Sequence, residues 1–144
     1  MLNIHYHQSN PSIPERATIG ASGYDLRSCE SVIIPPMSRA LVNTGIRLNI
    51  PRRFEGQVRS RSGLAAKHGV FVLNSPGTID SDYRGEIKVI LFNSGTDSFT
   101  INVGDRIAQL VFAAVFDASF IPASDAFFEE SDRASNGFGS TGVK

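Results

Sequence analysis

The sequence contains a single cysteine, no excess of either charge and no long apolar run. Because Cys29 stands alone, no internal disulfide can form, and we expect a reducing, cytoplasmic compartment. The 14 basic and 14 acidic residues balance, whereas a general nucleic-acid or membrane-surface binder needs a basic excess. No apolar run approaches the length of a membrane span, and residues Met1 to Asn10 lack the pattern of a signal peptide. We therefore expect neither a nucleic-acid partner nor a membrane partner.

Several catalytic signatures are also missing. No Walker A sequence and no G-x-S-x-G elbow occur, which argues against a P-loop NTPase and a serine hydrolase. The three histidines offer no metal spacing with a third ligand. Cys29 is a poor candidate nucleophile, because it lies in an exposed-looking turn beside Glu30, whose charge raises the pKa of the thiol.

Short segments rich in Val, Ile, Leu and Phe recur along the 144 residues, separated by Gly, Pro, Asn, Asp and Ser. This rhythm favours an all-β, antiparallel sandwich or barrel over alternating strands and helices. The expected strands lie in Ser31–Ile34, Ala40–Val42, Gly45–Ile50, Glu55–Arg59, Val70–Leu73, Ile87–Phe92, Ser98–Val103 and Ile107–Val115. One short helix is expected from Ser62 to His68, capped by Ser62 and ended by Gly69.

The stretch Asn74–Glu86 is the densest in chemistry. Its turn-forming residues predict a hairpin between the two buried strands Val70–Leu73 and Ile87–Phe92. Four groups capable of chemistry lie within five residues: Asp80, Asp82, Tyr83 and Arg84. An ordinary polar turn is the alternative.

Two further positions carry both a functional and a structural interpretation. Arg61 and Ser62 stand where the short helix begins, so they can bind an anion or form an ordinary N-cap. Gln109 alternates with apolar residues, so it lies either at a sheet edge or in a site. We interpret Asp105 as a turn acid and Arg106 as a structural or solvated base.

The composition changes after about Ala123, which predicts a β domain over residues 1–125 and a C-terminal arm over 126–144. The arm contains a formal G-x-G-x-x-G at residues 137–142. No strand precedes it and no helix follows, so it is not a Rossmann fingerprint, although its donors suit phosphate. A frayed terminus is the alternative.

Five motifs together resemble the trimeric dUTP pyrophosphatases (dUTPases), over most of the chain from about Ala21 to Gly142. The motifs are Ala21–Leu26, Arg61–Ala65, Gly77–Gly85, Gly104–Gln109 and Arg133–Gly142. The resemblance implies a jelly-roll-like fold, a homotrimer with shared sites, and Mg²⁺-dependent hydrolysis of dUTP to dUMP and pyrophosphate. Such an activity limits uracil incorporation into DNA and supplies dUMP for dTMP synthesis.

The resemblance also implies a role for each matching residue. Asp80 is the expected general base that activates the attacking water, and Tyr83 packs on the deoxyribose. Asp82 is interpreted as a structural turn acid. The hairpin residues expected around uracil are Asn74, Gly77, Thr78 and Ile79, with main-chain groups reading the base edge.

The remaining roles concern the phosphates and the metal. Phosphate contacts are expected from Arg61, Ser62, Gly63, Lys88 and Gln109, and Asp25 is expected to accept from waters on Mg²⁺. In the arm, Phe138 is expected to stack on uracil while Arg133, Gly139, Ser140 and Thr141 close on the γ-phosphate.

The chain departs from the family pattern at three places. Ala134 and Asn136 stand where the family usually has glycine, and Ser60 replaces a common proline, which we expect to loosen that loop slightly. Two rival functions stay open: a dCTP deaminase or a bifunctional relative, and a non-enzymatic jelly-roll module that binds proteins.

Overall fold

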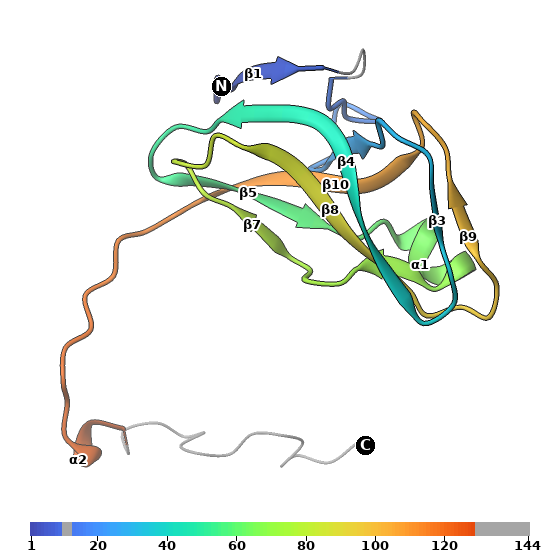
Figure 1. Ribbon diagram of the computed structural model, residues 1–144. Coiled ribbons are helices and arrows are strands. Elements are labelled where there is room, and N and C mark those ends of the chain that lie inside the picture. The colour runs from blue at the N-terminus through green and yellow to red at the C-terminus, as the bar shows by residue number, and fades with distance from the viewer. Residues whose placement is uncertain (10–12, 129–144) are drawn as a thin grey trace.

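The computed structural model describes residues 1–9 and 13–128, and its strands pair antiparallel throughout. Two four-stranded sheets have the orders β1-β4-β8-β6 and β2-β10-β5-β7, and β3 pairs with β9 (Figure 1). The elements are β1 His5–Gln8, β2 Tyr24–Arg27, β3 Val32–Ile34, β4 Ser38–Asn49, β5 Phe54–Arg59, α1 Ser62–His68, β6 Val70–Val72, β7 Gly77–Ile79, β8 Glu86–Asn93, β9 Phe99–Ile101, β10 Arg106–Ala114 and α2 Asp125–Phe128. The all-β prediction is confirmed.

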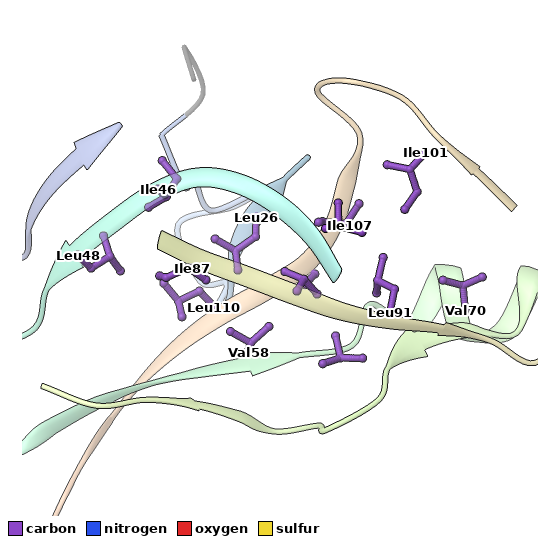
Figure 2. Packing of buried hydrophobic residues seen from close by; sticks show 14 of the residues in the cluster. Leu26, Ile46, Leu48, Val58, Val70, Ile87, Leu91, Ile101, Ile107 and Leu110 are labelled. Atoms are coloured by element: carbon purple, nitrogen blue, oxygen red, sulfur yellow. The ribbon is translucent and has the colours of Figure 1, made fainter. Parts of the chain in front are cut away.

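The core lies between the two four-stranded sheets (Figure 2). Strand β8 shows how the sequence builds it, because Ile87, Val89 and Leu91 are buried while the residues between them are more exposed. The side-chain period of two in a strand sends alternate residues to opposite faces. Lys88 and Ile90 therefore lie on the face of β8 that points away from the core.

The two strands expected at Ala40–Val42 and Gly45–Ile50 are one strand, β4, so the prediction of two was wrong. Its register against β8 shifts between Asn43 and Arg47, and Gly45 has φ of 70°. Thr44 donates its hydroxyl to the Ile87 carbonyl at 2.6 Å. A bulge supported by such side-chain bonds lets one strand continue across a glycine that normally ends it.

The connection between β6 and β8 is not the simple hairpin that the sequence predicted. The two strands do pair, with Val72 opposite Leu91, but the chain between them forms β7. Strand β7 pairs with β5 in the other sheet, placing Gly77 opposite Val58. The connection thus crosses between sheets because β5 offers it a free edge.

The short helix α1 spans the predicted residues and ends at Gly69, which adopts the left-handed conformation with φ of 66°. The N-cap is Arg61, whose backbone is extended and which makes no side-chain capping bond. The prediction that Ser62 caps the helix was therefore wrong, and Ser62 is the first helical residue.

Beyond β10 the chain leaves the sheets and runs out to α2 (Figure 1). Large apolar side chains of this segment are exposed, with Phe116 at 87% and Phe120 at 99%. In the described part of the chain, no helix is long and apolar enough to cross a membrane.

Candidate active site

A pocket of about 330 Å³ lies where β7, β8 and the loop between them meet. Seven residues predicted for the site line it: Asn74, Gly77, Thr78, Ile79, Asp80, Tyr83 and Lys88. Leu41 and Ile90, from the outer face of β4 and β8, give it apolar walls. The structure thus brings the predicted base-binding, sugar-binding and catalytic groups of the hairpin into one concave site.

The loop that carries Asp80 and Tyr83 is tied down by its own hydrogen bonds. The Tyr83 N–H donates to the Asp80 carbonyl at 3.2 Å, and the Tyr83 hydroxyl donates to the Glu86 carbonyl at 3.0 Å. Arg84 donates to the Ser81 carbonyl at 2.7 Å. Arg47, from β4, donates to the Arg84 carbonyl at 2.7 Å and fastens the loop to the sheet. Asp80 and Tyr83 therefore have defined positions at the rim of the pocket.

Glu86 is a pocket residue that the sequence analysis missed. Its carboxylate accepts the N–H of Gly45 at 2.8 Å, at the β4 bulge. Gly45 lies 41 residues from Glu86 in the chain, so no local sequence pattern predicts the contact. The only sequence signal was an acid at the start of a buried strand.

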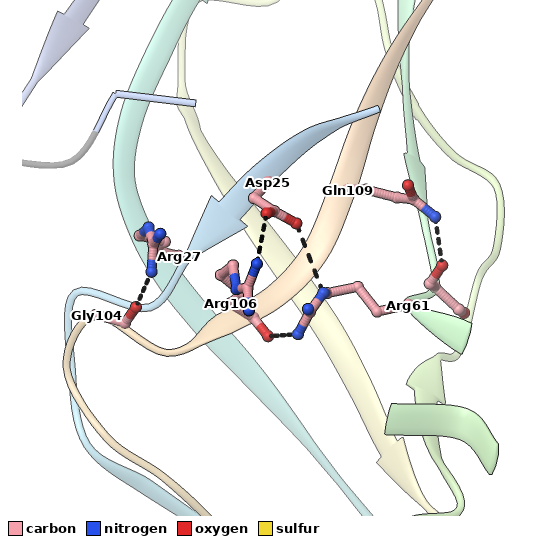
Figure 3. A network of polar contacts seen from close by, with 7 residues as sticks. Asp25, Arg27, Arg61, Gly104, Arg106 and Gln109 are labelled. Carbon is pink, nitrogen blue, oxygen red and sulfur yellow. Dashed lines mark hydrogen bonds and ion pairs between the residues drawn. The ribbon is translucent and has the colours of Figure 1, made fainter. Parts of the chain in front are cut away.

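A second group of predicted residues forms a polar network at β2, β10 and the start of α1 (Figure 3). The Asp25 carboxylate lies 3.6 Å from Nε of Arg61 and 3.3 Å from Nη1 of Arg106. Arg61 also donates to the Arg106 carbonyl at 2.8 Å. Arg106, interpreted from the sequence as a structural or solvated base, thus pairs with a predicted site residue 81 positions away.

Gln109 lies on β10, which has β2 on one side and β5 on the other, so the sheet-edge interpretation was wrong. Its amide donates to the Ser60 carbonyl at 2.9 Å, across to the end of β5 (Figure 3). Ser60 is itself held, because its hydroxyl accepts the Val72 N–H at 3.0 Å. The bond between Val72 and Ser60 ties the Ser60 loop to β6. We had expected serine at this position, in place of the family's common proline, to loosen the loop.

The two groups of residues do not share one pocket in the described part of the chain. Asp25, Arg61 and Gln109 belong to the polar network, and Ser62 and Gly63 start α1 as exposed residues. None of these five lines the pocket around Asp80. The arm residues Arg133, Phe138, Gly139, Ser140 and Thr141 lie outside the described residues, as do Ala134 and Asn136.

Cys29 lies outside the candidate pocket, and no catalytic role was predicted for it from the sequence. Cys29 is partly buried rather than exposed, and burial raises the pKa of its thiol. The carboxylates of Glu86 and Glu30 raise that pKa further, which confirms the predicted direction. Among the described residues, no group of three or more His, Cys, Asp or Glu side chains gathers as a metal cage. Each oxygen of the Asp25 carboxylate faces a guanidinium group, one of Arg61 and the other of Arg106.

A second hollow, of about 810 Å³, lies between the N-terminal segment and the β2-β10-β5 side of the molecule. Ile4, Tyr24 and Phe112 are among its lining residues. It contains none of the predicted site residues, so the smaller pocket is the candidate active site.

Comparison with known proteins places the chain in a family. The dUTPase family model matches residues 9–142. A deoxyuridine 5′-triphosphate nucleotidohydrolase of Zymomonas mobilis is 51% identical over 137 residues, which is 95% of this chain and 92% of that protein.

Solved structures show the same fold. A mutant form of the Staphylococcus bacteriophage 80alpha dUTPase with dUpNHpp superimposes with a TM-score of 0.88 at 26% identity, covering 98% of this chain and 99% of that one. The dUTPase of phage phi11 of S. aureus, in a mutant form described with a structural Mg(II) ion, gives a TM-score of 0.78 at 23% identity. It covers 85% of this chain and 97% of that one. With a family match over most of its length and a relative at half identity, the chain belongs to the dUTPase family.

Proposed function

We propose that the protein hydrolyses dUTP to dUMP and pyrophosphate in the pocket formed by β7, β8 and their connecting loop. The observation that carries the proposal is the convergence of Asp80, Tyr83 and the β7 backbone on one concave site. Membership of the dUTPase family supports the substrate and the reaction. The expected outcome in the cell is less dUTP available for incorporation into DNA and a supply of dUMP for dTMP synthesis, in a cytoplasmic protein.

Asp80 is the proposed general base. Hydrolysis between the α- and β-phosphates needs a water in line with the scissile bond and a group that removes its proton. Asp80 is exposed at the rim of the pocket, so its carboxylate is open to such a water. The proton passes from the water to a carboxylate oxygen as the water oxygen attacks the α-phosphorus, and pyrophosphate leaves.

The β7 segment is the proposed uracil reader. Asn74, Gly77, Thr78 and Ile79 line one wall, and backbone groups there can pair with the edge of a pyrimidine. Cytosine reverses the donor and acceptor pattern of that edge, so buried groups would stay unpaired and cytosine would be rejected. A thymine methyl would be excluded by its size.

Phosphate binding is assigned to Arg61, Ser62 and Gly63, with Gln109 and Lys88 in support. Charge on the three phosphates must be neutralised while the water attacks, and a bound Mg²⁺ supplies part of that neutralisation. Asp25 would hold the metal through its water shell. The pairing of Asp25 with Arg61 supports this assignment, because it ties the proposed metal contact to the proposed phosphate contact.

The proposed phosphate-binding residues other than Lys88 lie outside the uracil pocket, which supports a site shared between chains. Closed threefold symmetry would let the network of one subunit face the pocket of the next, and this is the proposed homotrimer. We assign residues 126–144 to an arm that closes over the nucleotide. In that arm Phe138 would stack on uracil, and Arg133, Gly139, Ser140 and Thr141 would close on the γ-phosphate.

Replacing Asp80 with Asn tests the proposed base. The amide cannot take the proton from water, so we expect turnover of dUTP to be abolished while binding of a non-hydrolysable dUTP analogue is retained. Pyrophosphate release and calorimetric binding measure the two properties. Asp82→Asn is the matched control, because Asp82 is an exposed acid of the same loop that does not line the pocket.

Substantial turnover by the Asp80→Asn variant would remove Asp80 from the role of base. Parallel incubation of the unmodified protein with dCTP separates the rival activity, since a deaminase would release ammonia. A protein that neither binds nor hydrolyses a deoxynucleotide would favour the non-enzymatic alternative.

A further inference from the structure

Gly85 follows the Tyr83 loop directly, and its backbone does not explain why it is glycine. Among the described residues, the glycines with left-handed backbone are Gly45, Gly69 and Gly104. Gly85 is not one of them, so any L-amino acid can adopt its φ without strain. The reason for glycine must be the space beside it.

That space is filled by the Tyr83 ring. A Cβ built on Gly85 would lie 2.5 Å from Cζ and 2.9 Å from Cε2 of Tyr83, and closer still to the hydroxyl oxygen. Real Cβ contacts essentially never fall below 3.0 Å. Three atoms of one rigid ring are involved, so no small adjustment of a flexible chain end removes the overlap.

The ring cannot move aside without losing its anchors. Its hydroxyl donates to the Glu86 carbonyl at 3.0 Å, and the Tyr83 N–H donates to the Asp80 carbonyl at 3.2 Å. A tyrosine has only two side-chain torsions. Turning χ1 carries the hydroxyl away from Glu86, and turning χ2 leaves the hydroxyl oxygen and Cζ in place on the ring axis, so the overlap with these two atoms stays. The bare face of Gly85 is therefore the surface on which the ring rests.

We propose that Gly85 is a positioning residue that sets the preference for deoxyribose over ribose by seating the Tyr83 ring against the sugar site. This inference rests on the proposed function, because it takes Tyr83 as the wall that excludes a ribose 2′-hydroxyl. Gly85 acts only through Tyr83, since a side chain at Gly85 meets the ring before it meets any nucleotide.

The test is a double-mutant cycle of Gly85→Ala and Tyr83→Ala, with kcat and KM measured for dUTP and for UTP. The alanine methyl displaces the ring, so Gly85→Ala raises KM for dUTP. We expect the dUTP/UTP ratio of kcat/KM to fall at least about tenfold, the scale on which small steric changes alter discrimination. In the Tyr83→Ala background, Gly85→Ala has no further effect on that ratio.

The matched control is Gly20→Ala, where an added methyl meets no heavy atom of the described chain within 4 Å and the backbone is likewise permissive. It leaves both substrates' kinetics unchanged. An unchanged dUTP/UTP ratio in Gly85→Ala would overturn the proposal. An equal loss in the Tyr83→Ala background would overturn it too.

Folding of each variant is followed by circular dichroism. If Gly85→Ala alone does not fold, the clash predicts that the double variant does, since the ring is gone. A double variant that also fails to fold overturns the inference. Failure of the proposed function is a separate result, because the unmodified protein would then show no dUTP turnover at all.

Discussion

At the residue scale, the site depends on small residues as much as on reactive ones. Gly23 has an ordinary φ, yet a Cβ there would lie 3.2 Å from Cβ and from Cδ of Gln109, and closer to its amide oxygen. Gln109 in turn donates to the Ser60 carbonyl at 2.9 Å. The absence of a side chain at Gly23 therefore provides the space that the Gln109 amide occupies.

Replacing Gly23 with Ala should push the Gln109 amide away from Ser60 and lower kcat for dUTP. The expected loss is about ten- to a hundredfold, because small misplacements of positioning groups cost this much. Steady-state kinetics of Gly23→Ala, Gln109→Ala and the double variant measure it. If the two losses simply multiply in the double variant, Gly23 does not act through Gln109.

The sequence alone indicated the candidate residues that lie close together in one turn. Asp80 and Tyr83 stand three positions apart in a turn, and their density and type indicated chemistry. The contacts of Arg106 and Glu86 were not predicted, because their partners Asp25 and Gly45 are remote in the chain and meet them only in the fold. A single sequence carries no sign of such contacts.

At the scale of elements, hydrophobic alternation predicted most strands but not their pairing. Strand β7 has three residues, too few for a period of two to show, and its partner β5 precedes it with α1 and β6 between them. The gap predicted between Val42 and Gly45 is a bulge within β4. Tertiary bonds from Thr44 and Glu86, not local propensity, hold that strand together.

Ser60 follows β5, and its hydroxyl holds β6 by accepting the Val72 N–H, so Ser60→Ala tests this connection. The Val72 N–H would lose its acceptor in a partly buried place, so the free energy of unfolding should fall by about 1 kcal/mol. Urea unfolding measures the change. Ser98→Ala, at an exposed serine, is the control and should leave the transition in place. An unshifted midpoint in Ser60→Ala would mean that the hydroxyl does not support the loop.

At the scale of the whole molecule, the segment beyond β10 leaves several large apolar side chains uncovered. Phe116, Phe120 and Ile121 are exposed by 87%, 99% and 82%. Exposed apolar patches of this kind mark surfaces that another protein covers. In the proposed trimer, a neighbouring subunit would cover them.

The protein should therefore have three times the 15.6 kDa mass of its chain when measured by light scattering. Phe120→Asp should shift the mass downwards at low concentration, because a buried unpaired charge opposes association. Arg52→Asp changes the charge at an exposed residue outside this segment and serves as the comparison. A chain that scatters as a monomer would contradict the shared site.

The packing of the Tyr83 ring on Gly85 also determines which mutations position 85 tolerates. Each of the nineteen alternatives to glycine carries a Cβ or a larger group, so all of them overlap the ring that rests on Gly85. In a saturation library screened for nucleotide selectivity, we expect variants at position 85 to be depleted as strongly as variants at Asp80. Intolerance to mutation at this position would then reflect the space that the Tyr83 ring needs, and not a contact between residue 85 and the substrate.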